Sequence, residues 1–421
     1  MDKFTVLGIL GEGAYGTVMK CRNSINGQVF AVKKFVPLRR QEMSNTIAME
    51  FTLLARLQHD NLIKVMSKFT EKSRLHCVFE LMDHSICEDM EQQPQGLESQ
   101  LLRKYTFQIL CGMEYLHSVN VLHRDIKPAN LLVSRSGVVK VADLGLGRVL
   151  DANRDPSLTL SIGTLWFLSP EALTGGLFLS KSHDVWAIGC TILAMAKSTA
   201  FIMGLTFLEQ LLMVVSKVGH LTVQQQQGFL IEYPGCNLPA PALPPGDPQQ
   251  KYRLCDPLLA QLVEASLQMD PDSRATCSEL LGQQYFTWDS FHQRFSMELA
   301  EMVQADQHGA SLTQLMDQPQ TTDIPICPSG CLDPDTVGPH ESSCSPEIPP
   351  EIRPEIPLEI LPEIHPEIPP EILPDISPDI SEDITSEAAS VKRKGRCGAG
   401  FLRVMRNIRG FFTACCSPNR E

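Results

Sequence analysis

The chain has 421 residues, of which 43% are apolar, and a formal net charge of −13 at pH 7. This length allows two or three domains, and the apolar fraction is enough for a large core. The composition excludes several classes of protein: no run reaches the roughly 18 uncharged apolar residues of a membrane span, and the 14 cysteines lack the paired spacing of a zinc or disulfide framework. Nothing in the main body indicates nucleic-acid binding. The first residues, Met1 to Phe4, carry no apolar secretory run, so we expect an intracellular, cytoplasmic protein with free thiols.

The first half of the chain alternates between strand-like and helix-like patterns. Residues 4–35 are short apolar runs separated by glycine turns, which predict hairpin-connected strands. Apolar positions recur at helical spacing over residues 41–57 and again over 101–117. A short strand is predicted between them, over residues 74–81. Residues 121–142 are typical of loops and short strands.

Beyond Asp184 the pattern is mainly helical, with a proline-rich loop at residues 234–248. Residues 287–345 are less regular and are expected to form a linker that begins with a short helix and continues without structure. The helix is predicted from the apolar residues Phe291, Phe295, Leu299 and Met302.

A tetrapeptide of proline, an acid, isoleucine and a variable residue repeats ten times from Pro346 to Thr385, with Leu358 and Glu382 in place of the proline in two of the repeats. Proline at every fourth position excludes regular helix and central strand, so residues 346–387 are expected to be a disordered, extended segment. This segment holds 12 acids and one arginine, whereas residues 391–421 hold eight bases and one acid. A basic tail therefore follows an acidic segment.

Residues Gly11-Glu12-Gly13-Ala14-Tyr15-Gly16-Thr17-Val18 form a glycine-rich loop between two predicted strands. Glycine lets the backbone approach phosphate oxygens and offer N–H donors to them. This motif alone is weak evidence, because dinucleotide-binding folds share it and a plain glycine turn can produce it. Here a strand rather than a helix follows, and Ala31-Val32-Lys33 comes about one hairpin later.

The most informative stretch is His123-Arg124-Asp125-Ile126-Lys127-Pro128-Ala129-Asn130, with Asp143-Leu144-Gly145 starting 13 residues after Asn130. It places a candidate base, a phosphate-contacting lysine and two metal-binding side chains within 19 positions. The pattern of types is that of the catalytic and magnesium-binding segments of protein kinases. The lysine two residues after the aspartate is the serine/threonine form of the motif.

Over residues 4–286 the chain resembles a eukaryotic serine/threonine protein kinase domain. The resemblance implies an α+β, bilobal protein kinase fold with a small, mainly-β N-lobe and a larger, mainly-α C-lobe, followed here by a disordered tail. Asp143 to Arg148, Gly163-Thr164 and Leu168 to Glu171 are similar to NIMA-related kinases in the catalytic loop and activation segment. The N-terminal lobe, from Gly11 to Phe35, resembles the cyclin-dependent-kinase-like group.

The resemblance implies ATP and Mg²⁺ as cofactors and assigns roles to individual residues. Asp125 accepts the proton of the substrate hydroxyl, Lys127 neutralises charge on the transferred group, and Lys33 holds phosphates with Glu50 as its counter-charge. Asn130 and Asp143 are the metal ligands. The residues expected around the nucleotide are Leu10, Gly11, Gly13, Gly16, Val18, Ala31, Lys33, Phe79, Glu80, Met82 and Leu132. His123 is expected to be structural and to pack against Leu144.

The resemblance also implies regulatory and structural contacts. Arg124 offers a cation to a phosphorylated activation segment, whose candidate acceptors are Ser157, Thr159 and Ser161. Thr164 is expected to hydrogen-bond near Asp125 and Lys127. Two further contacts are expected to be structural: Asp184 bracing the catalytic loop, and Arg274 pairing with Glu171. Residues 165–168 are bulkier than in the two groups named, so peptide preference does not carry over.

The function implied is transfer of the γ-phosphoryl group of ATP to serine or threonine of protein substrates. The alternative is a catalytically weak scaffold that binds partners through its proline-rich tail. Residues 401–412 form a basic amphipathic pattern flanked by Cys397, Cys415 and Cys416, which indicates an anionic membrane surface or a calmodulin-like partner for residues 391–416. Folding back onto the acidic repeat and, as the lesser alternative, nuclear targeting through Lys392 to Arg396 remain open.

Overall fold

The computed structural model describes residues 3–13, 16–35, 56–72, 74–143, 148–149, 163–176, 180–238 and 246–316. Four expectations lie mostly or wholly outside these residues: the helix over 41–57, the activation-segment hydroxyls, the acidic repeat of residues 346–387 and the basic C-terminal tail. In the part of the chain that is described, no helix has both the length and the apolar composition needed to cross a membrane.

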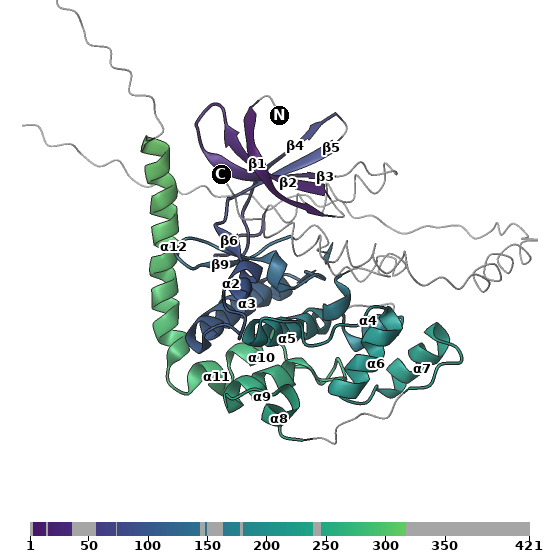
Figure 1. Ribbon diagram of the computed structural model, residues 1–421. Helices are drawn as coiled ribbons and strands as arrows, with labels where there is room; N and C mark the ends of the chain where they lie inside the picture. Colours follow the sequence, from purple (N-terminus) through teal and green to yellow (C-terminus); the bar gives the residue numbers. More distant parts are fainter. Residues whose placement is uncertain are drawn as a thin grey trace, which may run out of the picture. The chain divides into compact units, whose positions relative to one another are not determined.

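The small lobe is a five-stranded antiparallel sheet in the order β1-β2-β3-β5-β4 (Figure 1). Its strands are β1 (Phe4–Gly13), β2 (Gly16–Asn23), β3 (Val29–Phe35), β4 (Val65–Glu71) and β5 (Arg74–Phe79). Alternating side chains bury one face of this sheet. The buried residues there are Met19, Cys21, Phe30, Val32 and Val78. The hairpin strands predicted from residues 4–35 and the strand from Arg74 are confirmed.

Gly16 starts β2 in a conformation that other residues rarely adopt. Its φ is +146°, and a Cβ atom there would lie 2.0 Å from the carbonyl oxygen of Lys34 on β3. Any side chain would therefore push β2 away from β3 at the point where the glycine-rich loop begins. The glycine predicted from the sequence motif is required by the sheet itself.

The large lobe is mainly helical and lies on one side of the sheet (Figure 1). Its first helices are α2 (Ile86–Gln92), α3 (Ser99–Ser118), α4 (Pro170–Leu173), α5 (Lys181–Lys197), α6 (Phe207–Lys217) and α7 (Val223–Glu232). They are followed by α8 (Pro248–Tyr252), α9 (Pro257–Ser266), α10 (Cys277–Leu281), α11 (Gln284–Thr287) and α12 (Phe291–Met316). The two lobes match the bilobal α+β architecture that the resemblance implied.

The core of the large lobe is built on α3 and α5. Helix α3 begins where the Glu98 carboxylate accepts hydrogen bonds from the N–H groups of Gln100 and Leu101. Such a cap satisfies N–H groups that have no partner within the helix. Helix α5 is buried from His183 to Met195, as expected of a helix surrounded by other elements.

Short elements between the lobes carry the residues of the catalytic motif. They are β6 (His84–Ser85), β7 (Val121–Leu122), the 3₁₀ turn η1 (Pro128–Asn130), β8 (Leu131–Val133), β9 (Val139–Val141), β10 (Arg148–Val149) and the 3₁₀ turn η4 (Leu165–Phe167). Strands β6, β8 and β9 form one small sheet, and β7 pairs with β10. This arrangement brings the end of β5, the catalytic motif and Asp143 close together.

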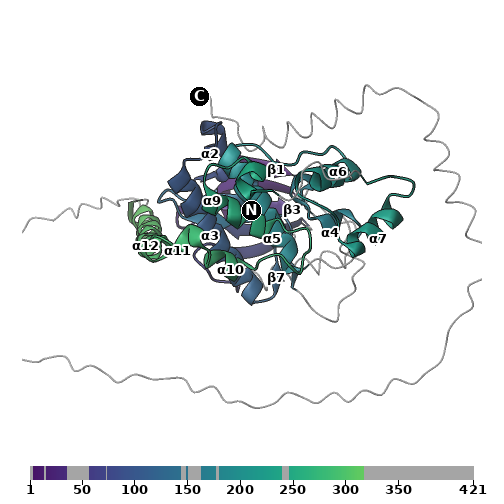
Figure 2. The same cartoon turned by 90° about the horizontal axis from the view of Figure 1, so that it is seen from below.

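The packed part of the chain continues past residue 286. The sequence suggested a linker from 287 with a short helix, whereas α12 spans 26 residues. Phe291 and Phe295 are buried in the core of the large lobe, and both rings lie within 6.0 Å of the Phe107 ring on α3. Figure 2 shows α12 at the edge of the helical lobe, next to α11 and on the side away from α6 and α7. The first turns of α12 therefore belong to the folded unit.

Candidate active site

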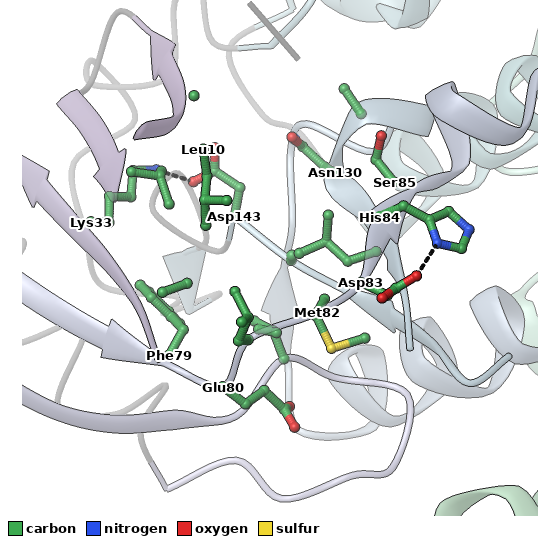
Figure 3. A pocket seen from close by; sticks show the side chains of 18 of the residues that line it. Leu10, Lys33, Phe79, Glu80, Met82, Asp83, His84, Ser85, Asn130 and Asp143 are labelled. Carbon is green, nitrogen blue, oxygen red and sulfur yellow. Dashed lines mark hydrogen bonds and ion pairs between the residues drawn. The ribbon is translucent and has the colours of Figure 1, made fainter. Parts of the chain in front are cut away.

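A cavity of about 290 Å³ lies between the sheet of the small lobe and the helical lobe (Figure 3). Its walls include every residue that the sequence predicted around the nucleotide except Gly13 and Gly16. Those two face each other in the register at the tip of the β1–β2 hairpin, next to residues that the structure does not describe. The cavity is of the size and largely apolar character of a small-molecule site.

Strand pairing places Lys33 at the inner end of this cavity. On β3 it lies opposite Val18 of β2 and Cys77 of β5, in the centre of the sheet. Its ammonium group donates to the Asp143 carboxylate, as the dashed line in Figure 3 shows. Burial alone would raise the pKa of Asp143, but the charge and hydrogen bond of the Lys33 ammonium, together with nearby His123 and Lys127, hold that pKa below its ordinary value. Glu50, the predicted counter-charge of Lys33, lies outside the described residues.

The predicted base, Asp125, is almost fully buried and held by four donors. Lys127 Nζ donates to its Oδ2 at 2.7 Å, and Asn130 Nδ2 donates to the same oxygen at 3.0 Å. The backbone N–H and the hydroxyl of Thr164 donate to Oδ1 at 3.0 and 2.8 Å. Lys127 also donates to the Thr164 hydroxyl at 2.7 Å. The expected contacts of Thr164 with both residues are therefore present.

Asp184 on α5 holds the backbone of the catalytic loop at His123 and Arg124. The N–H groups of His123 and Arg124 donate to its two carboxylate oxygens at 2.9 and 2.8 Å, and His117 Nε2 lies 3.0 Å from Oδ2. Burial would raise the pKa of Asp184, but the hydrogen bond from His117 and nearby histidines lower it to about 2. Arg124 is held at φ +69°, a conformation unusual for a residue other than glycine. The bracing role expected of Asp184 is present in the geometry.

His123 packs as a structural residue. Its Nε2 lies 2.9 Å from the carbonyl oxygen of Ala142, and its Nδ1 accepts from the N–H of Asp125 at 3.2 Å. It thus joins the catalytic loop to the residue before Asp143. Leu144, its predicted neighbour, is outside the described residues.

Glu171 and Arg274 form the predicted ion pair, although 103 positions separate them. The guanidinium donates to the two carboxylate oxygens at 2.9 and 3.2 Å, and the arginine side chain is fully buried. Burial would raise the pKa of Glu171, but the charge and hydrogen bonds of Arg274, together with nearby His183, hold that pKa below its ordinary value. The pair ties α4, just after the Thr164 segment, to the loop before α10.

Two oxygen-bearing side chains are available for a cation at the cavity floor. Asn130 and Asp143 both line the cavity, and the nitrogen of Asn130 is used on Asp125, which leaves its amide oxygen as the ligand it would offer. Carboxylate and amide oxygens are the ligands that Mg²⁺ prefers. Among the described residues there is no group of three or more His, Cys, Asp and Glu side chains arranged to hold a metal.

The outer rim of the cavity contains residues that sequence reasoning missed. Asp83, His84, Ser85 and Glu88 line it, directly after Met82 in the chain. Both ring nitrogens of His84 face carboxylates, with Nδ1 3.2 Å from Asp83 and Nε2 3.0 Å from Asp89. Burial lowers the pKa of His84, but the two carboxylates together raise it by more than burial lowers it, so the net shift is upward. The only sequence signal for these residues was that they follow directly after Met82, which was already expected to contact the nucleotide.

The sequence comparisons agree with this geometry. The family model described as protein kinase domain matches residues 4–286. The chain belongs to the protein kinase family. Cyclin-dependent kinase-like 2 from Oryctolagus cuniculus and from Homo sapiens are each 39% identical to this kinase over 316 residues, which is 75% of its length. Cyclin-dependent kinase-like 4 from Mus musculus is 33% identical over 292 residues, covering 68% of this kinase and 84% of the relative.

The match to cyclin-dependent kinase-like proteins extends well beyond the N-terminal lobe, where the sequence first suggested it. This kinase spans 56% of the length of the rabbit protein and 64% of the human one. The likeness of its activation segment to NIMA-related kinases stays a prediction, and so do the roles of Ser157, Thr159 and Ser161, which lie outside the described residues.

Proposed function

We propose that this kinase transfers the γ-phosphoryl group of ATP to serine and threonine side chains of protein substrates, with Mg²⁺ as its cofactor. The observation that carries the proposal is the Asp125–Lys127–Thr164 network, which Asn130 joins to the cavity that Lys33 and Asp143 line. Positioned charges of this kind are what phosphoryl transfer requires of a protein.

Each side chain has a definite task in this proposal. Asp125, fixed by its four donors, accepts and orients the hydroxyl of the acceptor residue. The ammonium of Lys127 lies 2.7 Å from that carboxylate and stabilises negative charge that develops beside it. Bound magnesium–ATP would supply the phosphoryl group and a cation to offset its charge. Lys33, Asp143 and Asn130 would hold its phosphates and metal at the inner end of the cavity.

The rival function, a scaffold with a weak active site, predicts no such cooperation among the site residues. The full-length chain should therefore be given magnesium–ATP and a generic acceptor protein, and its rate compared with that of Asp143→Asn. We expect the substitution to lower the rate by orders of magnitude, because catalysis here depends on charge and position. The exposed Asp272→Asn is the matched control and should retain the wild-type rate.

Two results would reject parts of the proposal. Wild-type activity in Asp143→Asn, in a preparation free of other kinases, would reject the assigned mechanism. Acid hydrolysis of the labelled product should yield phosphoserine or phosphothreonine, because Lys127 occupies the position typical of kinases for these residues. Label found only on phosphotyrosine would reject the substrate class.

A further inference from the structure

Three positive side chains gather around the Phe201 ring in the large lobe. The ammonium groups of Lys197 and Lys217 lie 5.9 and 5.0 Å from the centre of this ring. The centres of the Phe201 and Tyr252 rings are 5.8 Å apart, and Arg253 follows Tyr252 in the chain. Lys197, Lys217 and Arg253 are here called the cation cluster. None of the three lines the nucleotide cavity.

The cation cluster is assembled by packing, because its members come from three separate segments. Lys197 ends α5, Lys217 ends α6, and Arg253 directly follows α8. Lys217 Nζ donates to the carbonyl oxygen of Phe201 at 2.6 Å, and the Arg253 backbone is held at φ +53°. Figure 1 shows α8 at the end of the large lobe that is remote from the five-stranded sheet. The cluster is therefore a fixed feature of the fold, away from the proposed site of catalysis.

No carboxylate among the described residues forms an ion pair with the cation cluster. Burial lowers the pKa values of Lys197 and Lys217, and the positive charge of Arg253 lowers both further. Lys217 also acts on Lys197 in the same direction. The neighbouring Lys251 is different, because its Nζ lies 3.0 and 2.9 Å from the two carboxylate oxygens of Glu264. The fold thus neutralises one cation here and leaves three together.

The helix ends offset only part of this positive charge. The C-terminal end of a helix carries about half a negative charge, which favours a cation in the last turn. The ends of α5 and α6 together therefore offset about one of the three charges. Residues 239–245, which precede α8 and lie outside the described part of the chain, contain no charged side chain. About two positive charges are left for a ligand.

An excess of this size matches a compact anion that carries two negative charges. A phosphate monoester carries about −1.5 to −2 at pH 7 and has three oxygens that accept strong hydrogen bonds. Guanidinium and ammonium groups are the donors that bind such oxygens in proteins. A single carboxylate has one charge and two oxygens, so it would satisfy only part of the cluster.

We propose that the cation cluster binds a phosphate monoester, carried by a phosphorylated serine or threonine of a protein or by a phosphorylated lipid headgroup. Arg253 is exposed and can reach the ligand from solvent, whereas the two lysines are partly buried against Phe201. The site attaches the kinase to a phosphorylated partner and does not depend on the proposed function.

The test measures binding to the full-length chain. Fluorescence anisotropy compares a labelled glycine–alanine peptide that contains one phosphoserine with the same peptide containing serine or glutamate, and inorganic phosphate is the competitor. Sedimentation with phosphatidylcholine vesicles, with and without phosphatidylinositol 4-phosphate, tests the lipid source. We expect the phosphoserine peptide to bind at least tenfold more tightly than the serine and glutamate peptides, because charged hydrogen bonds to three oxygens are available only to phosphate.

Two variants connect the binding to the cation cluster. Lys197→Gln and Arg253→Gln each remove one charge and leave the contact of Lys217 with the Phe201 carbonyl in place. Each should weaken binding of the phosphoserine peptide at least tenfold. Without ligand, the unfolding temperature should stay the same or rise, because repulsion between like charges falls. The control is Lys3→Gln, the same change at an exposed lysine outside the cluster, which should keep the wild-type affinity.

The variants also identify which binding counts, because the basic tail carries positive charge of its own. Peptide or vesicle binding that both glutamine variants lose and Lys3→Gln retains supports the site, and the probe that binds tells the source of the phosphate. Binding that the glutamine variants retain overturns the proposal, as does failure of every probe to bind. A glutamate peptide that binds as tightly as the phosphoserine peptide also overturns it.

Discussion

Replacing Asp184 by asparagine tests how far the catalytic loop depends on a single buried carboxylate. The change keeps the size of the side chain but removes its charge and replaces an accepting oxygen by a donating amide group. Asp184 now accepts from the N–H groups of His123 and Arg124 and lies 3.0 Å from His117 Nε2. In the variant one backbone N–H must face an NH₂ group, so one buried donor loses its partner.

The cost can be worked out from the structure. The pKa of Asp184 lies at about 2 instead of 3.8, so the fold favours its charged form by roughly 2–3 kcal/mol. A buried donor left without a partner costs about 1–3 kcal/mol, which gives the same range. In addition, Arg124 is held at φ +69°, and such a conformation persists only while its surroundings impose it. We expect a loss of about 2–4 kcal/mol in unfolding free energy and a fall in turnover of at least tenfold.

Urea unfolding of the full-length chain measures the loss of unfolding free energy, and phosphoryl transfer to an acceptor protein measures the fall in turnover. The exposed Asp272→Asn should change stability by no more than about 0.5 kcal/mol. Because the pKa of Asp184 is lower in the folded state, its contribution is complete above about pH 4 and is lost as the pH falls toward 2. Asp184→Asn should therefore lose less unfolding free energy than the wild type as the pH falls from about 4 toward 2. Unchanged unfolding free energy and unchanged turnover would refute the reasoning.

Three further predictions concern other parts of the chain. Arg274→Met should destabilise the fold by about 3–5 kcal/mol in urea unfolding, because it leaves the Glu171 carboxylate buried without its partner, and Glu171→Gln in the same chain should recover part of the loss. Phosphate on Thr159 or Ser161 should raise activity by pairing with the cation of Arg124 in the catalytic loop. Phosphatase treatment should therefore lower the rate of phosphoryl transfer, and an unchanged rate would contradict the prediction. A fluorescent fusion of residues 388–421 should stain the membrane rim of live cells and lose that staining when Cys397, Cys415 and Cys416 are serine, whereas a diffuse or nuclear signal would argue for the rival interpretations of the tail.

The sequence predicted the site well where function depends on fixed residue types at fixed spacing. Asp125, Lys127 and Asn130 lie within one short loop, so their proximity follows from the chain itself. The pairing of Arg274 with Glu171 could be predicted only through the resemblance, because 103 positions separate the two residues. The involvement of His117 could not be predicted, since its contact with Asp184 depends on how α3 packs against α5.

The boundary at residue 286 shows a different limit. Phe291 and Phe295 were recognised as an apolar helical pattern, but spacing alone does not tell which surface a short amphipathic helix covers. In the structure this helix covers Phe107 on α3, whose ring contacts the rings of Phe291 and Phe295 edge-on. Likewise, the residues at the cavity rim could not be identified as a group, because the side chains of Asp83, His84 and Asp89 meet only when the chain turns from β6 into α2.

The position of α12 has a practical consequence for anyone who prepares the catalytic part alone. A fragment ending at residue 286 would uncover the Phe107 ring and leave the Arg103 guanidinium, only 9% exposed, without the Asp289 carboxylate that it contacts at 2.6 Å. It would also lose the Phe291 ring, which lies 4.2 Å from that guanidinium. Such a fragment would expose an aromatic patch beside an unmatched charge and should aggregate. A fragment that continues beyond Met302 would keep the patch covered and remain in solution.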